Sequence, residues 1–290
     1  MGLGISALRS ALEFSEKGFF DDKESVIDMG SQEIHIKKED FIEITNSFNY
    51  APNWDNFPCT YKDIWPGFPR DSSSNFWKML KFKKVDCCDI NNEHDSIYID
   101  LNKPLEDKNL FMKYDLVTDF GNNEHPFNTA EAYRTMHRLC KEKGLIWINQ
   151  ALFGGNGFYN FDISFFESIA AVNKYDILSS YFTLDTKDGD QPRLPLSMGL
   201  LELLDRNKIQ CLGVSYLFKK NFEKDFIMPV QNLGDLKSQC LYKASLIPET
   251  THLGINQTRA YIPSKAEVGA KQAFSIILNK IKQKIFKKII

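Results

Sequence analysis

Short apolar runs that end beside an acidic residue recur along the chain. The three clearest runs are residues 25–30, 85–90 and 114–121. Runs of this length without a helical period are typical of strands buried on both faces of a parallel sheet. We therefore predict strands that carry Asp28, Asp89 and Asp119 to one shared edge of a sheet, where ligands bind in folds of this kind.

Segments with apolar side chains at helical spacing separate these strands. The predicted helices are residues 5–17, 75–82, 129–143, 161–173 and 200–206. Further strands are expected at residues 97–101, 145–148, 175–184 and 211–218. Asn128 or Thr129 would cap the third helix and Gly144 would end it, while Asn160 would cap the fourth. Strands alternating with helices predict an α/β fold with a doubly wound, mainly parallel sheet.

The connection between the first two strands is long and rich in aromatic residues and proline. We assign residues 36–71 to an insertion, with its aromatic residues concentrated between positions 50 and 69. A structureless segment of this size inside a domain usually serves as a lid or binding loop. The alternative is a surface flap that packs on its own aromatic rings.

Composition narrows the class of protein. The chain has 290 residues and is 43% hydrophobic, which is enough for a substantial core. Its 36 basic and 38 acidic residues give a net charge of -2, so no nucleic-acid partner is expected. The six cysteines form no Cys-x-x-Cys pair, and no apolar run approaches about 18 residues. These features predict a cytoplasmic protein with reduced thiols.

The last part of the chain has a different character. Residues 267–290 place lysines between apolar side chains at helical spacing. Such a basic amphipathic helix could touch an anionic membrane surface or a partner, but packing of its apolar stripe on the domain is the favoured interpretation. The predicted organisation is a helix in residues 1–24, a main domain in 25–231 and an extension in 232–290.

In order and residue type, the region 24–230 resembles the class I S-adenosylmethionine-dependent methyltransferases. The first run matches the branch whose first motif reads acid-x-Gly-x-Gln, and residues 114–125 read Tyr-Asp-Leu-Val-Thr-Asp-Phe-Gly-Asn-Asn-Glu-His. A helix, a strand and the loop Gly-Gly-Asn-Gly at 154–157 follow in the family's order. The resemblance implies a seven-stranded Rossmann-like sheet, S-adenosylmethionine as cofactor, and a small-molecule or sugar-containing acceptor.

The resemblance also assigns parts of the cofactor to strand ends. The methionine moiety would lie beside Asp28, Gly30, Ser31 and Gln32, with Asp28 near the ammonium. The ribose would bind Asp89, which is followed by Ile90, and the adenine would lie beside Asp100 and Leu101. Asp119, Phe120 and Gly121 would line the floor of the site near the methyl group. The chain departs from the pattern in two respects. Only one glycine is present in the first turn, and about sixty residues separate Asp28 from Asp89 where dinucleotide folds have about 20.

His125 is the predicted general base, because an imidazole titrates near neutral pH, and Glu124 would orient it or contact substrate. The alternatives are a histidine that only supports the entry to the next helix and an exposed loop glutamate. No repeated histidine spacing suggests a metal site. A catalytically silent binding module remains a second hypothesis. A nicotinamide-dependent oxidoreductase is disfavoured, because the chain lacks Gly-x-Gly-x-x-Gly.

Overall fold

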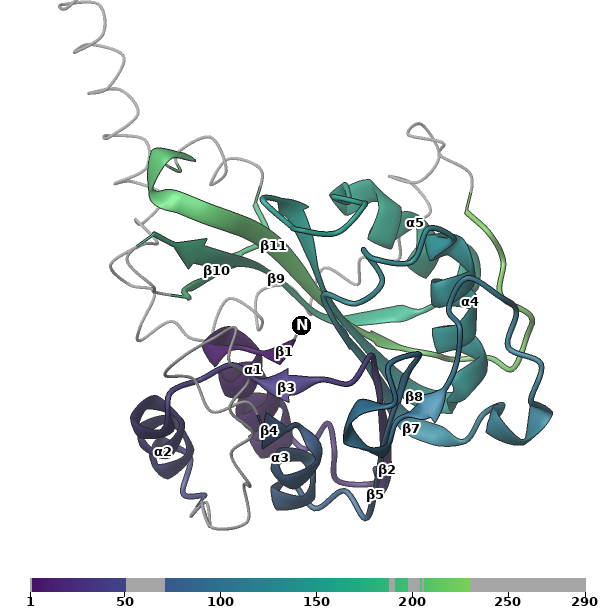
Figure 1. Cartoon of the computed structure of the whole chain (residues 1–290), viewed down its shortest axis with the longest axis horizontal. Coiled ribbons are helices and arrows are strands. Elements are labelled where there is room, and N and C mark those ends of the chain that lie inside the picture. The colour runs from purple at the N-terminus through teal and green to yellow at the C-terminus, as the bar shows by residue number, and fades with distance from the viewer. Residues whose placement is uncertain (1, 51–70, 188–190, 198–203, 205, 230–290) are drawn as a thin grey trace, which may run out of the picture.

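The computed structural model describes residues 2–50, 71–187, 191–197, 204 and 206–229 (Figure 1). The aromatic stretch of the insertion, most of the expected helix at 200–206 and the basic C-terminal segment lie outside these ranges. Among the described helices, none combines the length and the apolar character needed to cross a membrane.

The main sheet has the strand order β10-β9-β11-β8-β7-β2-β5-β6. Its strands are β2 (Ser25–Met29), β5 (Lys84–Asp89), β6 (Ile97–Tyr98), β7 (Tyr114–Phe120), β8 (Cys140–Phe153), β9 (Asp176–Thr186), β10 (Arg193–Pro195) and β11 (Ile209–Lys219). The five strands from β6 to β8 are parallel, whereas β11 lies antiparallel between β8 and β9. The predicted doubly wound, mainly parallel sheet is confirmed, with the short antiparallel strand β10 added at one edge.

Helices cover both faces of this sheet (Figure 1). They are α1 (Ile5–Glu16), α2 (Lys38–Ser47), α3 (Ser74–Met79), α4 (Thr129–Leu139) and α5 (Ile163–Asn173). Alternate strand residues point to opposite faces. Val26 and Trp147 therefore pack with the first three helices, while Ile27 and Ile148 pack with α4 and α5. These two apolar layers explain why the central strands have no polar face.

A second, three-stranded sheet has the order β1-β3-β4. Its strands are β1 (Gly2–Leu3), β3 (Glu33–Ile34) and β4 (Asp71–Ser72). The described part of the predicted insertion at 36–71 is not structureless, because it contains α2 and the start of β4, whereas the helix predicted at 75–82 is confirmed as α3. Phe41 and Ile44 of α2 are buried in the core, and this burial stabilises the helix.

Two predicted helix boundaries are also wrong. Gly144 lies inside β8, because α4 ends at Leu139 and the chain continues directly into the strand. A Cβ atom at Gly144 would meet the Cys140 sulfur at 2.7 Å, so close packing requires the glycine there. Asp162, not Asn160, caps α5 by accepting a hydrogen bond from the Ser164 N–H at 2.8 Å.

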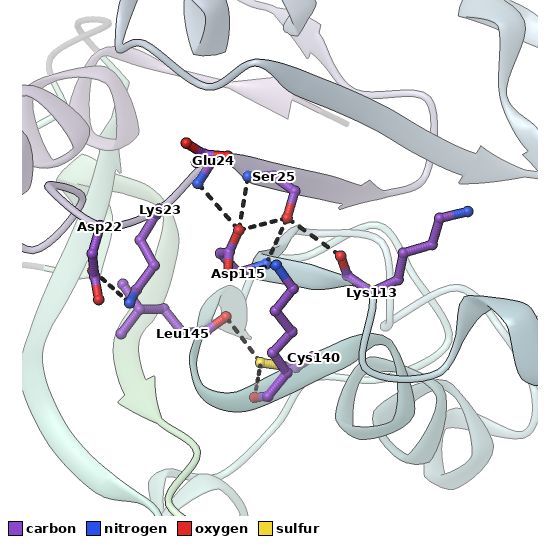
Figure 2. Close-up of polar contacts among 9 residues, drawn as sticks. Asp22, Lys23, Glu24, Ser25, Lys113, Asp115, Cys140 and Leu145 are labelled. Carbon is purple, nitrogen blue, oxygen red and sulfur yellow. Dashed lines mark hydrogen bonds and ion pairs between the residues drawn. The ribbon is translucent and has the colours of Figure 1, made fainter.

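Polar contacts anchor the strand ends remote from the predicted site (Figure 2). One oxygen of Asp115, on β7, accepts hydrogen bonds from the N–H groups of Glu24 and Ser25 at 3.1 and 3.0 Å, and from the Ser25 hydroxyl at 2.6 Å. Its other oxygen pairs with Lys141 at 2.8 Å. The acid thus fixes β2 beside β7 and leaves the opposite ends of both strands to form the candidate site.

Candidate functional site

A tight turn follows β2 at the carboxyl edge of the sheet. Gly30 has φ +81°, a conformation that residues with a side chain rarely adopt. A Cβ atom at this position would lie 2.6 Å from the Asn122 Oδ1 atom and 3.3 Å from the Gln32 Nε2 atom. Glycine therefore lets the turn after β2 pack closely against the turn after β7.

Two amide side chains at this junction have buried polar atoms without a hydrogen-bond partner in the described part of the chain. These atoms are Gln32 Oε1 and Asn122 Nδ2. Both residues are almost fully buried. The Gln32 Nε2 group donates a hydrogen bond to the Met29 carbonyl at 2.6 Å. Leaving such an atom unpaired costs about 1–3 kcal/mol, so the pair is suited to a polar ligand. Sequence reasoning missed Asn122, although its place directly after Gly121 was a usable signal.

Asp89 connects the end of β5 to the same turn. Its Oδ2 atom accepts hydrogen bonds from the Ser31 N–H at 2.9 Å and the Ser31 hydroxyl at 3.1 Å. Its Oδ1 atom accepts from the Ile90 N–H at 2.6 Å. The carboxylate is only partly buried, so it can also accept hydrogen bonds from a ligand.

Two exposed apolar side chains flank this carboxylate. Ile90 is 59% exposed, and Tyr98, which pairs with Asp89 in the register of β5 and β6, is 65% exposed. Exposed apolar groups beside a hydrogen-bonding acid suit the flat ring and the hydroxyls of a nucleoside. Ile90 was predicted from the sequence, whereas Tyr98 was missed because it read only as part of a strand.

Asp100 and Leu101 follow β6 at the edge of the sheet. The Asp100 carboxylate accepts a hydrogen bond from the Asn102 N–H at 3.0 Å and pairs with Lys103 at 3.0 Å. The hydrogen bond from Lys103 lowers the pKa of Asp100. Leu101 is buried in the core, so its side chain supports this loop from beneath.

Asp28 does not face the open edge. Its carboxylate is wholly buried and accepts hydrogen bonds from Ser73, Thr118 and the Trp77 indole N–H, the last at 3.0 Å. Burial raises its pKa to about 6, although all three donors act to lower it. The structure therefore places this acid at the junction of α3 with β2 and β7, where donors from α3, from the residue before it and from β7 contact its oxygens.

Asp119 is also buried, beneath the turn after β7. It accepts hydrogen bonds from the N–H groups of Asn122 and Asn123 at 2.9 and 3.2 Å, and from the Gln150 side chain at 2.5 Å. Burial raises the pKa of Asp119 to about 7. These contacts show that Asp119 shapes the turn that carries Asn122.

The other two residues predicted for the floor differ in exposure. Phe120 is 4% exposed and packs edge to face on Trp147, with ring centroids 4.9 Å apart. Gly121 has φ +76°, and a Cβ atom there would meet no atom within 4 Å. Of this pair, Gly121 therefore borders open space at the end of β7.

Glu124 and His125 lie next along the same turn. The Glu124 backbone carbonyl accepts hydrogen bonds from the N–H groups of Phe158 and Tyr159 at 2.8 and 3.3 Å, and burial raises the pKa of its carboxyl group. The alternative of an exposed loop glutamate is wrong, because this residue is 4% exposed and anchors the loop after β8.

The His125 side chain is 36% exposed, and its Nε2 atom lies 3.7 Å from Glu124 Oε1. Burial lowers the pKa of this imidazole below its ordinary value of 6.5. The ring is therefore neutral at neutral pH. Its Nε2 atom has no hydrogen-bond partner within the described residues.

Two phenyl rings form an apolar rim near His125. Phe127 and Phe158 are 78% and 73% exposed, and their centroids lie 6.4 Å apart in an edge-to-face arrangement. The Tyr159 hydroxyl donates to the Phe127 carbonyl at 2.7 Å and joins the two loops that carry these rings. The side of the site next to the candidate base is thus apolar and exposed.

No protein-family model matches the chain, and no curated protein sequence does. One solved structure with a similar chain path is an S-adenosylmethionine-dependent methyltransferase from Archaeoglobus fulgidus. It is 12% identical with a TM-score of 0.41, and the match covers 74% of this chain and 94% of that one. Another is the 1,6-didemethyltoxoflavin-N1-methyltransferase of Burkholderia thailandensis, which is 9% identical with a TM-score of 0.39, and the match covers 74% of this chain and 78% of that one. That structure holds its substrate and S-adenosylhomocysteine.

The order of the strands gives the fold independently of these likenesses. Seven strands follow the order β6-β5-β2-β7-β8-β11-β9, and β11 alone among them is reversed. Helices cover both faces, and the glycine turn and Asp89 lie at the carboxyl ends of adjacent strands. The chain therefore has a doubly wound, Rossmann-like α/β fold.

Proposed function

We propose that this protein is an S-adenosylmethionine-dependent methyltransferase that acts on a small-molecule or sugar-containing acceptor. One observation carries the proposal. The Gly30 turn is packed against Asp89 through Ser31, and the same junction contains the orphaned amide atoms of Gln32 and Asn122. These groups match a ligand with hydroxyls at one end and charged amino and carboxylate groups at the other.

Each part of the cofactor has a chemically suitable partner. Gln32 Oε1 would accept a hydrogen bond from the ammonium, and Asn122 Nδ2 would donate one to the carboxylate. Asp89 would accept from the ribose hydroxyls, with Ile90 and Tyr98 beside the adenine. When bound, the cofactor supplies a methyl group on a sulfonium, which a nucleophile attacks in line.

His125 is proposed to remove the proton from the acceptor. Its pKa is lowered by burial, so the ring is neutral at neutral pH and can take a proton. Glu124 Oε1, at 3.7 Å, would stabilise the imidazolium that results. The rim of Phe127 and Phe158 would exclude water from one side of the acceptor. These roles favour an acceptor with an apolar or ring-shaped surface.

The test is calorimetric titration of the purified full chain with S-adenosylhomocysteine, with NADH as a comparison ligand. We expect one saturable site for the first ligand and none for the second. Asp89→Asn removes the charge that accepts the ribose hydroxyls, and Gly30→Ala forces a Cβ atom against Asn122. Each should weaken binding at least tenfold, or about 1.4 kcal/mol.

Glu106→Gln is the matched control, because it removes one negative charge from an exposed position outside the site. The affinity of this variant for S-adenosylhomocysteine should equal that of the unaltered chain. Absence of S-adenosylhomocysteine binding, or equal affinity in all variants, would overturn the proposal. Tighter binding of NADH would favour the oxidoreductase alternative.

A silent binding module would share the cofactor affinity but not the turnover. Methyl transfer by the unaltered chain to any acceptor in a broad screen separates the two, and His125→Ala then tests the general base with that acceptor. The variant should retain its affinity for S-adenosylhomocysteine and lose most of its methyl transfer, because only proton removal depends on the imidazole. Failure of a broad acceptor screen with a fully cofactor-competent chain would favour the silent module.

A further inference from the structure

A second polar cluster lies directly behind the Gly30 turn. It contains Glu33 from β3 and two residues of the 3-10 segment Glu93–Asp95, namely Glu93 and His94. One side-chain oxygen or nitrogen from each of the three lies within 4.8 Å of the others. This separation allows one ion to contact all three, since metal-to-ligand distances in proteins are about 2.0–2.6 Å.

Glu33 is the centre of this cluster. It is 3% exposed, so its charge needs compensation inside the protein. Its Oε1 atom lies 3.3 Å from His94 Nε2, and its Oε2 atom lies 3.6 Å from His35 Nε2. Carboxylate oxygens and imidazole nitrogens are both common ligands of divalent metals, and here they lie side by side.

Asp71 supplies an independent indication. This residue is 5% exposed, and its Oδ2 atom is buried without a hydrogen-bond partner in the described part of the chain. It lies on β4, which pairs with β3 so that Asp71 is opposite Ile34, the residue after Glu33. A buried carboxylate oxygen without a donor in the strand next to Glu33 favours a positively charged ligand in this part of the molecule.

We propose that Glu33, Glu93 and His94 bind a divalent transition-metal cation such as Zn²⁺ or Mn²⁺. Carboxylates with an imidazole suit such cations better than Mg²⁺, which favours oxygen ligands and retains water. The site has no marked spacing in the sequence, because its members come from segments about sixty residues apart that only the fold brings together.

The cation would stabilise the junction that shapes the candidate cofactor site. Glu33 directly follows Gln32, and Glu93 lies four residues after Asp89. Asn91 already bridges the two segments, since its Nδ2 group donates to Ser31 Oγ at 2.8 Å and its Oδ1 atom accepts from the Glu93 N–H at 2.9 Å. A bound cation would add a second connection between the turn after β2 and the segment after β5.

The experiment uses the full chain after chelator treatment, without any cofactor. Zn²⁺ and Mn²⁺ are titrated by calorimetry, and Co²⁺ is titrated by visible absorption, which reports ligation directly. We expect one saturable site. Glu93→Gln and His94→Gln are chosen over changes at Glu33 because both side chains are partly exposed and their loss should spare folding.

Each of these variants should weaken metal binding at least tenfold. The control is Asp95→Asn, a neighbouring exposed acid outside the cluster, which should retain the affinity of the unaltered chain. Circular dichroism checks that every variant is folded. No saturable binding, equal binding in all variants, or a thiolate-to-cobalt band that places the ion on cysteine would overturn the proposal. Because the cofactor is absent throughout, these outcomes do not depend on the proposed methyl transfer.

Discussion

Three acidic residues near strand ends differ in their exposure to solvent. Asp89 is partly exposed and accepts hydrogen bonds from a turn, whereas Asp28 and Asp119 are wholly buried and organise the residues around them. Side-chain direction does not explain the difference, because Asp28 pairs in register with Cys87, two residues before Asp89, and the two acids therefore point to the same face. The difference follows from what covers each carboxylate. Asp28 points to the face that carries α3, where Trp77 and Ser73 meet it. A carboxylate near a strand end is therefore not by itself a ligand-binding group.

Asp28→Ala is expected to destabilise the fold. The change leaves the buried donors of Ser73, Thr118 and Trp77 without their acceptor, which should cost about 3 kcal/mol in the free energy of unfolding. Urea denaturation followed by circular dichroism measures the loss. Asp89→Ala, at the exposed edge, should cost much less. An unchanged unfolding midpoint for Asp28→Ala would contradict the structural role.

At the scale of elements, α1 is joined to the far edge of the main sheet. Arg193, on β10, makes two contacts with the Glu13 carboxylate at 2.7 and 3.0 Å and donates to Ser10 Oγ at 2.8 Å. Tyr181 of β9 donates to the same Ser10 oxygen at 2.6 Å. Since Arg193 is 4% exposed, the pair lies in an environment with little solvent screening.

Arg193→Ala should therefore loosen α1. Breaking a buried pair by removing one partner costs about 3–5 kcal/mol, because the remaining charge loses its compensation. Hydrogen exchange of the α1 amides should accelerate more than exchange of the α4 amides. Lys83→Ala is the matched control, because its pair with Glu24 is exposed and such pairs contribute about 0–1 kcal/mol. Equal effects of the two changes would contradict this assignment.

At the scale of the whole molecule, stability should depend on pH through Asp119. Burial raises the pKa of this carboxyl from 3.8 to about 7, so the folded state binds a proton more tightly than the unfolded state. The resulting stabilisation is complete below pH 4 and is lost as the pH rises through about 7. Its full size is on the order of 4 kcal/mol, at 1.36 kcal/mol for each pKa unit.

The comparison of the unaltered chain with Asp119→Asn isolates this contribution. It must be isolated, because burial lowers the pKa of His137 to about 4 and gives a contribution of opposite sign, one that increases between about pH 4 and 6.5. Urea denaturation at intervals from pH 4 to 8 should show the unaltered chain losing stability relative to the variant. Parallel pH profiles for the two proteins would contradict the assignment.

The pattern of apolar residues was sufficient to predict the central strands, α1, α4 and the class of the sheet. The hydrophobic pattern of a strand or helix depends only on nearby residues. Because β2, β7 and β8 are buried on both faces, each gives a clear apolar run in the sequence. The pattern failed for the β1-β3-β4 sheet, whose two-residue strands are too short to show a period. It also misplaced the boundary at Gly144, because a helix that passes directly into a strand has no terminating signal.

The sequence by itself determined which residues end the central strands, and so brought Gly30, Asp89 and Gly121 to one edge. Only the tertiary structure decided what covers each side chain, burying Asp28 against α3 and leaving Asp89 partly exposed. It also brought Asn122 against Gly30, and Glu33 beside His94. The physical reason is that periodicity records local backbone geometry, whereas contacts between distant segments depend on how strands pair and how helices pack upon them.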